Sequence, residues 1–175
     1  VELPLKFIEA EAGFETFQKT GNALPPETIA ACESSDAILF GATGSPMEKV
    51  EGYFSPILAL RKHFDLYANL RPAIQDEIKL LIVRENTEGL YSRRERVEEN
   101  GDTAITERII TAKASRRIVK LACELAMRRG KRLALVHKAN VLKESDGLFR
   151  RVGLEVAADY PELAVHEVLV DAMAM

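Results

Sequence analysis

The sequence predicts an α/β protein in which strands and helices alternate. Apolar runs such as DAILFG (36–41), KLLIV (79–83) and KRLALVH (131–137) are typical of strands buried in a sheet. Segments with helical spacing of apolar residues lie between such runs, and the pair Asn100-Gly101 is a strong hairpin signal. This alternation indicates a layered α/β architecture.

The composition of the chain argues against several classes of protein. At roughly 150 residues per domain, 175 residues predict one domain or two small ones, and 47% hydrophobic with 29% charged residues is typical of a globular chain. The net charge of −3 argues against a protein that coats nucleic acid. The two cysteines, Cys32 and Cys123, form no CxxC pair, and no apolar run is long enough to span a membrane. We therefore expect a cytoplasmic protein with neither a disulfide framework nor a zinc site.

The first third of the chain shows the alternation. We expect a strand over 5–10, a helix that begins at Pro25-Pro26, a strand over 36–41 and a helix over 56–63. Small residues follow the second strand, in the loop from Gly41 to Pro46. Loops at the carboxyl ends of buried strands are where open α/β sheets bind ligands, so this loop is a first candidate site.

The remaining elements are predicted from local signals. Strands are expected over 66–70, 79–83, 131–137 and 164–170, helices over 111–129 and 145–158, and a projecting polar hairpin over 91–110. The helix over 111–129 is amphipathic and closes with basic residues and Gly130.

Three arginines in the central third are candidates for anion binding. Arg61 follows a predicted helix, Arg71 precedes a proline, and Arg84 directly ends an apolar strand. An arginine offers a planar fork of donors to a carboxylate, although any one of them alone is more often a surface residue. Together they predict a pocket for a polycarboxylate.

A candidate acid, base and metal ligand lie in the same part of the chain. The phenol of Tyr91 can donate a proton, and Lys138, which ends a strand, can serve as a base. Asp171 ends the last strand, where a carboxylate can bind Mg²⁺. Each has a simpler alternative, namely packing for the tyrosine and exposure for the lysine, and one aspartate does not make a metal site. These residues predict an anion pocket but name no reaction.

Four strings together carry a resemblance to a known family. They are LRKHFDLYANLRP (60–72), VRENTEGLY (83–91), HKANVL (137–142) and VDAMAM (170–175). In order and spacing they resemble the metal-dependent β-decarboxylating dehydrogenases of 2-hydroxy acids, the isocitrate/3-isopropylmalate dehydrogenase family. Within it, KVEGYFSPILALRK (49–62) and KESDGLFR (143–150) are most similar to the members that oxidise homoisocitrate.

The resemblance implies a two-domain isocitrate/isopropylmalate dehydrogenase-like fold with a protruding β-hairpin arm, of which this chain holds only part. Residues 1–67 would belong to the first, larger α/β domain, and residues 68–175 would form the second, with a dimerisation arm at about 91–110. The family's first strand with its glycine-rich turn, two further metal aspartates and the loop for the adenosine are absent from this sequence. The resemblance also implies a homodimer, or a dimer of dimers, in which Lys138 and Asp171 reach the neighbouring subunit's site.

The implied reaction is the NAD-dependent oxidative decarboxylation of homoisocitrate, a tricarboxylate, to 2-oxoadipate in lysine biosynthesis by the α-aminoadipate route. Mg²⁺ or Mn²⁺ would assist it. By resemblance Arg61, Arg71 and Arg84 grip substrate carboxylates, Lys138 is the general base, and Tyr91 is the acid that protonates the enol. The other implied site residues are Asn140 between substrate and nicotinamide, Thr43, Gly44 and Ser45 along the cofactor and substrate tail, Ser55 and Leu58 beside the substrate side chain, and Asp171 as metal ligand. A preference for NAD over NADP comes only from the resemblance.

Other functions stay open. The substrate can instead be isocitrate, 3-isopropylmalate or tartrate, and a non-catalytic regulatory subunit of the same fold would bind polycarboxylates without turnover. The presence of Tyr91, Lys138 and Asp171 favours an enzyme. Basic runs at 93–94 and 128–132 could serve a nucleic-acid module, but the acidic net charge and the lack of interleaved aromatic residues argue against it.

Overall fold

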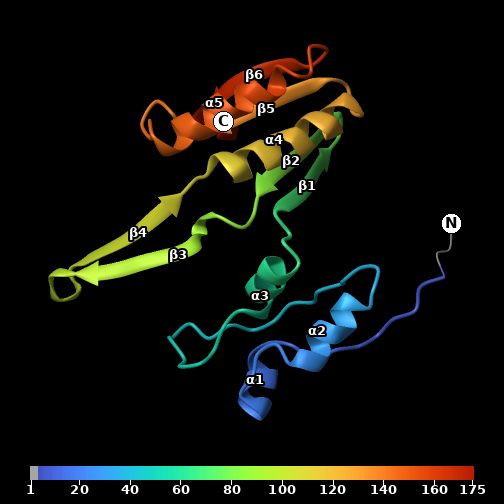
Figure 1. The fold of residues 1–175 in the computed structure, drawn as a ribbon, viewed down its shortest axis with the longest axis vertical. Helices are drawn as coiled ribbons and strands as arrows, with labels where there is room; N and C mark the ends of the chain where they lie inside the picture. Colours follow the sequence, from blue (N-terminus) through green and yellow to red (C-terminus); the bar gives the residue numbers. More distant parts are fainter. Residues whose placement is uncertain (1–3) are drawn as a thin grey trace. The chain divides into compact units, whose positions relative to one another are not determined.

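The computed structural model describes residues 4–175, which form two compact units divided between Asp65 and Leu66. Within its described residues the first unit contains the helices α1 (Phe14–Thr20), α2 (Pro26–Glu33) and α3 (Pro56–His63), drawn in blue to green in Figure 1. The second unit contains six strands and three α-helices. No helix within residues 4–175 is both long and apolar enough to cross a membrane.

The helices of the first unit follow local signals. Proline occupies the first helical position of α2 and of α3, where its missing N–H breaks no hydrogen bond, and both predicted helices are confirmed. Helix α1 was not predicted, because it is only seven residues long and its N-cap is Gly13, which has no side chain to form a capping bond. Gly21 closes it in the left-handed conformation that glycine favours, with φ of 76°.

Two strands predicted in the first unit are wrong. Residues 5–10 and 36–41 have no regular secondary structure. A strand is stable only when a neighbouring strand accepts its hydrogen bonds, and neither segment pairs with another among the described residues. Both segments have the composition of a buried strand, but neither has a neighbouring strand to pair with among the described residues. The loop at 41–46 consequently does not follow a strand.

The strands of the second unit form two-stranded sheets. Strands β1 (Ala68–Gln75) and β2 (Ile78–Glu85) pair antiparallel, joined by Asp76-Glu77 with Asp76 at a φ of 49°. Strands β5 (Arg132–His137) and β6 (Ala164–Leu169) pair in parallel, as the crossover through a helix requires. All four predicted strands are confirmed, although β1 extends five residues beyond its predicted end.

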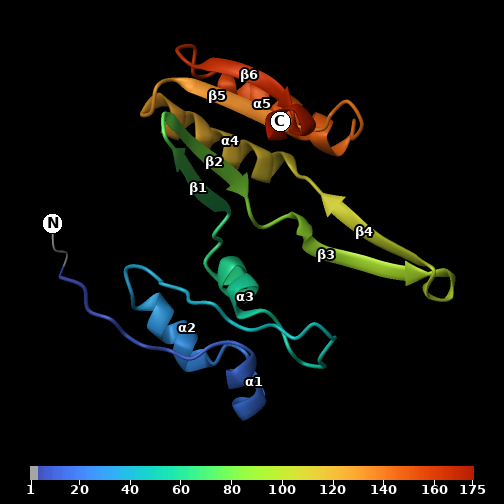
Figure 2. The ribbon, with the colours of Figure 1, turned by 180° about the vertical axis from the view of Figure 1, so that it is seen from behind.

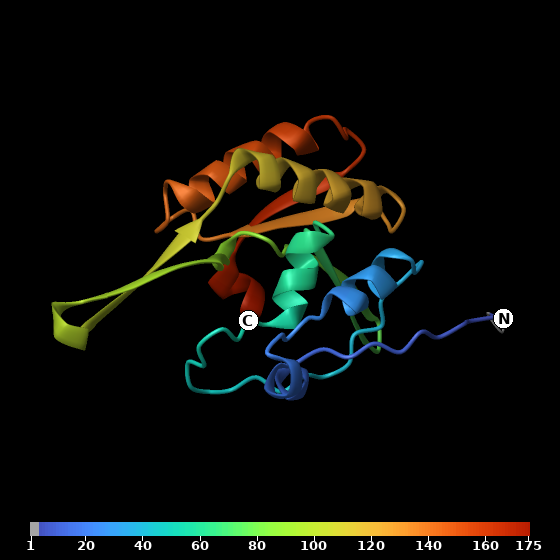
Figure 3. The same cartoon turned by 60° about the horizontal axis from the view of Figure 1, so that its bottom comes forward.

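Helices α4 (Ala112–Met127) and α5 (Ser145–Ala157) pack beside each other on one face of β5 and β6, as Figure 3 shows. Thr111 caps α4 by accepting a hydrogen bond from the N–H of Ala114 at 3.1 Å. Gly153 lets α5 approach β5, because a Cβ there would lie 3.2 Å from Leu135. The core between these elements is Ile118, Val119, Cys123, Ala126, Leu135, Val152, Val156, Ala157 and Leu163. A short helix, α6 (Val170–Ala174), follows β6 and was not predicted.

A hairpin projects from the second unit, as Figure 2 shows. Strands β3 (Gly89–Glu98) and β4 (Thr103–Ile109) pair antiparallel and are joined by the 3-10 turn η1 (Glu99–Gly101), in which Asn100 has a φ of 55°. Asparagine and glycine tolerate such positive φ values, which is why this pair predicted the turn. Arg96 ties the strands together through Glu107 on β4 at 2.9 Å. We call residues 89–109 the arm.

Candidate functional site

Arg71 and Arg84 share one face of the β1–β2 pair. Asn69 lies directly opposite Arg84 in the register, and Arg71 is two residues further along β1. Because side chains on a strand alternate between faces, Asn69, Arg71 and Arg84 all point to the same side. The two arginines are therefore diagonal neighbours, close enough for long side chains to reach the same ligand. Residues on the other face of these strands, among them Ala68 and Val83, pack against the core.

Two asparagines orient these arginines. Asn69 accepts a hydrogen bond from Nε of Arg71 at 3.1 Å, and Asn86 accepts one from Nη2 of Arg84 at 3.4 Å. Asn86 is buried, and its backbone N–H donates to the carbonyl of Tyr67 at 2.8 Å. Neither asparagine was among the predicted site residues. A signal was present for Asn69, since it lies two residues from Arg71 on β1 and a strand places such residues on one face. Asn86 lies one residue beyond the end of β2, so strand alternation does not predict its contact with Arg84.

Tyr91 lies close to Arg84. The guanidinium carbon of Arg84 is 5.8 Å from the centre of the Tyr91 ring, within the range of a cation–π contact. Tyr91 is near the start of the arm and is 41% exposed, so its phenol is accessible to a ligand. A predicted acid and two predicted anion-binding arginines thus gather on one part of the second unit.

Lys138 and Asp171 form a second group, at the carboxyl end of the parallel pair. His137 is opposite Leu169 in the register, so β5 and β6 end at the same edge of the sheet. Lys138 directly follows β5, whereas Asp171 does not end the strand as predicted: β6 ends at Leu169, and Asp171 lies in the first turn of α6. Nζ of Lys138 makes an ion pair with Oδ2 of Asp171. Carboxyl ends of parallel strands are where α/β sheets place their ligand sites. Asn140 is exposed in the turn after Lys138.

The turn that carries Lys138 is held by several hydrogen bonds. The carbonyl of Lys138 accepts from the N–H groups of Val141 at 3.0 Å and Leu142 at 2.8 Å. Nδ1 of His137 accepts from the N–H of Ala139 at 3.2 Å, so the proton of a neutral His137 ring lies on Nε2. That nitrogen faces Glu167, 3.4 Å away. The backbone around Lys138 is thus fixed by residues on both sides.

Asp171 is the predicted metal ligand, and its carboxylate suits that role. Its side chain is 61% exposed and offers the hard oxygen atoms that Mg²⁺ and Mn²⁺ prefer. Among residues 4–175 no group of three or more histidine, cysteine, aspartate and glutamate side chains is arranged to hold an ion. Asp171 fits a divalent cation as one ligand of a larger set.

In the first unit, three predicted residues share a spacing of three on or beside α3. Ser55 is the N-cap of α3, Leu58 lies in its middle, and Arg61 lies in its last turn, all partly exposed. Residues three apart are neighbours on a helix surface, so Leu58 and Arg61 lie on the same side of α3, with Ser55 next to them at its N-terminus. The spacing brings these three together within their own unit.

The predicted cofactor loop, Thr43–Ser45, is held from two sides. The Tyr53 hydroxyl donates to the carbonyl of Gly44 at 3.3 Å and lies 3.4 Å from the Ser45 hydroxyl. Thr43 packs against Gly13, where an added Cβ would lie 3.1 Å from it. A Cβ added at Gly44 would meet no atom within 4 Å, so a ligand can approach the backbone there closely. The loop is open, as a cofactor contact requires.

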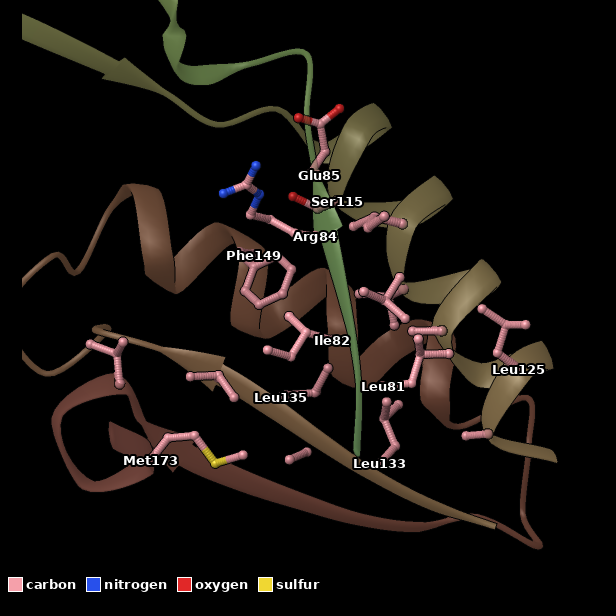
Figure 4. Close-up of a pocket in the computed structure, with 18 of the residues that line it drawn as sticks. Leu81, Ile82, Arg84, Glu85, Ser115, Leu125, Leu133, Leu135, Phe149 and Met173 are labelled. Carbon is pink, nitrogen blue, oxygen red and sulfur yellow. The ribbon is translucent and has the colours of Figure 1, made fainter. Parts of the chain in front are cut away.

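A cavity of about 1140 Å³ lies in the second unit between β2, α4 and β5. Figure 4 shows Ile82 and Arg84 on one side of β2 and Leu81 on the side of α4, with Leu133 and Leu135 across from them. The lining is mostly apolar and includes Phe149 and Met173. Among the described residues β2 pairs only with β1, and β5 pairs only with β6.

Glu85 anchors the end of β2. It accepts from the N–H groups of Thr87 at 2.7 Å and Glu88 at 2.9 Å, and from Arg117 at 3.1 Å. Burial acts to raise the pKa of the Glu85 carboxyl, but these hydrogen bonds and one from the Thr87 hydroxyl outweigh it and hold that pKa below its usual value. Arg117 also lies over the Tyr67 ring at 4.4 Å. The network fixes the segment between Arg84 and Tyr91.

The chain is similar to known proteins over its whole length. The family model described as isocitrate/isopropylmalate dehydrogenase matches residues 1–175. A Thermus thermophilus protein named isocitrate/homoisocitrate dehydrogenase is 46% identical over 181 residues, and the match covers 99% of this chain and 54% of that protein. The homoisocitrate dehydrogenase of Methanocaldococcus jannaschii is 45% identical over 190 residues, covering 97% and 54%.

A solved structure is similar over the same region. The crystal structure of isocitrate dehydrogenase from Methylococcus capsulatus superposes with a TM-score of 0.85 at 36% identity, covering 94% of this chain and 51% of that one. The chain therefore spans about half the length of the curated relatives that it matches.

Proposed function

Because the chain belongs to the isocitrate/isopropylmalate dehydrogenase family, we propose that the complete protein carrying it is an NAD-dependent decarboxylating dehydrogenase of a 2-hydroxy acid. The observation that carries this proposal is the ion pair of Lys138 with Asp171 at the end of the parallel strands, which joins a base to a metal carboxylate. A regulatory subunit, which carries out no turnover, needs neither a base nor a metal ligand. The cytoplasm is the location that we propose for this enzyme.

The substrate that we propose is homoisocitrate, which NAD would oxidise and which would then lose CO₂ to give 2-oxoadipate on the α-aminoadipate route to lysine. Two similar relatives are named for homoisocitrate, and one of these names also includes isocitrate. Isocitrate, 3-isopropylmalate and tartrate are the alternatives. Ser45, Ser55 and Leu58 are the residues that we expect to meet the variable end of the substrate.

Each group has a role in the proposed reaction. Arg71 and Arg84, with Arg61 of the first unit, bind the carboxylates of the substrate through their guanidinium forks. Lys138 would take the proton of the substrate hydroxyl, with NAD as the hydride acceptor, and the resulting ketone would lose CO₂ to leave an enolate, to which Lys138 returns the proton to give the enol. Tyr91 protonates the enol carbon, and Thr43, Gly44, Ser45 and Asn140 contact the cofactor. Asp171 would supply one of the ligands of Mg²⁺ or Mn²⁺, and such an ion would provide polarisation of the hydroxyl and stabilisation of the enolate charge.

We propose that the enzyme is a homodimer, or a dimer of dimers, with Lys138 and Asp171 contributed to the partner's site. The projecting arm supports this proposal, because most of its residues are exposed and it packs mainly on itself. An extended hairpin that leaves the body of its unit is suited to pairing with a second copy across a two-fold axis.

A substrate panel tests the proposal. We expect the complete protein, with Mg²⁺ and NAD, to form NADH faster with homoisocitrate than with isocitrate, 3-isopropylmalate or tartrate at equal concentration. Faster turnover of one of the others would change the substrate and leave the reaction class intact. Absence of NADH with all four, together with binding of a tricarboxylate, would show a regulatory subunit instead.

A further inference from the structure

We propose that Asp146 is a positioning residue for Lys138, and that Arg108 acts through it. The inference rests on the proposed function, in which Lys138 is the base. Oδ2 of Asp146 accepts a hydrogen bond from the backbone N–H of Lys138 at 2.6 Å, and Oδ1 accepts one from Nη1 of Arg108 at 2.5 Å. The Asp146 carboxylate thus joins the backbone of Lys138 to Arg108, which lies 38 positions before Asp146 in the chain.

The burial of Asp146 makes this contact costly to lose. Its side chain is only 6% exposed, whereas the Arg108 side chain is 43% exposed. A buried carboxylate without partners carries a large desolvation cost, and a backbone N–H left without an acceptor adds to it. The two hydrogen bonds therefore define one position for the Lys138 backbone rather than several.

The three residues come from separate elements. Arg108 is near the end of β4, at the base of the arm, Lys138 follows β5, and Asp146 lies in the first turn of α5. The N–H of Asp146 in turn donates to the carbonyl of Leu142, and the N–H of Leu142 donates to the carbonyl of Lys138. Backbone hydrogen bonds therefore link Lys138 to Asp146 through Leu142. Asp146 is therefore the point where the arm, the turn of the base and α5 meet.

The expected consequence concerns turnover more than substrate binding. The Arg84 side chain donates a hydrogen bond to Asn86, whereas Asp146 accepts one from the Lys138 backbone. A base displaced by about 1 Å loses alignment with the proton that it takes, and such misplacement costs roughly 10²-fold in rate. A purely structural role would lower stability without separating kcat from KM.

The test uses the complete protein and compares Asp146→Ala with Asp146→Asn and with a matched control. We expect Asp146→Ala to lower kcat roughly 10²-fold with KM for the hydroxy acid within threefold. Asp146→Asn keeps an oxygen for the Lys138 N–H, so it should recover most of this loss. Glu155→Ala is the control, because Glu155 is also on α5 and accepts from Arg116 at 3.2 Å and Arg151 at 3.1 Å, yet lies near the surface. It should leave kcat unchanged.

A second readout follows the backbone directly. Amide hydrogen exchange over residues 137–142 should be faster in Asp146→Ala than in the wild type or Glu155→Ala, by tenfold or more. Arg108→Gln should lower kcat less than Asp146→Ala, and should add little to it in the double variant.

The outcomes separate the two proposals. A wild type that oxidises no 2-hydroxy acid would refute the proposed function and this inference with it. An active wild type whose Asp146→Ala and Asp146→Asn variants keep the control's kcat, or raise KM as much as they lower kcat, would overturn the inference alone. Exchange at 137–142 that matches the control would overturn it as well.

Discussion

Asn69 on β1 lies directly opposite Arg84 on β2, and this register brings Arg71 and Arg84 to one face of the strand pair. Two guanidinium groups at diagonal positions can bind two carboxylates of one small acid, or two sides of one carboxylate. The Asn69 and Asn86 side chains restrict both arginines by accepting hydrogen bonds from them. Substrate binding by this face is the first property to test.

Replacing Arg84 by lysine should weaken substrate binding. The lysine keeps the charge but loses the planar fork and the bond to Asn86, so we expect KM for the hydroxy acid to rise roughly 10- to 100-fold. Steady-state kinetics on the complete protein measure this. Arg151→Lys is the control, since Arg151 is an exposed residue that pairs with Glu155 on the same helix. An equal KM in both variants would contradict the prediction.

Replacing Lys138 by methionine should abolish turnover without disturbing assembly. General-base catalysis contributes about 10²–10⁴-fold, so kcat should fall by that factor or more while the side chain keeps similar volume. Light scattering should report the same oligomer as the wild type. Activity near that of the wild type would remove Lys138 as the base, and a change of oligomer would show that the ion pair with Asp171 serves assembly instead.

Shortening the arm should separate the subunits. Arg94 and Glu107 are cross-strand partners, so removing residues 95–106 and joining 94 to 107 by Asn-Gly preserves the register. We expect this variant to be a monomer in size-exclusion chromatography with light scattering. Arg96→Ala breaks the ion pairs with Glu98 and Glu107 but keeps the hairpin, and should stay dimeric. A dimer without its arm would show that another surface holds the subunits together.

Replacing Glu85 by glutamine should destabilise the protein in a pH-dependent way. The folded pKa of Glu85 is lowered, so its contribution to stability is present above the pKa of the unfolded chain and is lost as the pH falls through the folded pKa. We expect a loss of about 1–3 kcal/mol at pH 7, measured by urea unfolding, that shrinks toward pH 3. Glu155→Gln, at an exposed position, should cost less than about 1 kcal/mol. A Glu85→Gln loss that is constant with pH would contradict the assignment.

Elements with local signals could be predicted from the sequence, and elements that need distant partners could not. The Asn100-Gly101 pair and the amphipathic spacing of α4 lie within the segments that they organise, so the arm and α4 follow from them. Residues 5–10 and 36–41 have equally suggestive compositions, but a strand requires a neighbour that the local pattern cannot reveal.

The candidate site shows the same division. That Arg71 and Arg84 share a face depends on the β1–β2 register, which rests on where the turn at Asp76 falls. The bond from the Lys138 backbone to Asp146 joins residues eight apart, and no spacing rule for a helix or strand predicts it. Asn69 could have been predicted, since it lies two residues from Arg71 on the same strand, whereas Asn86 follows the end of β2 two residues after Arg84.

The cavity between β2 and β5 has a consequence for handling this chain by itself. Both strands border an apolar space, and among the described residues each has a hydrogen-bonding neighbour on one edge only. Open edges with apolar side chains recruit strands from other molecules, a route to precipitation during purification. Bacterial overproduction of these 175 residues alone should therefore yield inclusion bodies.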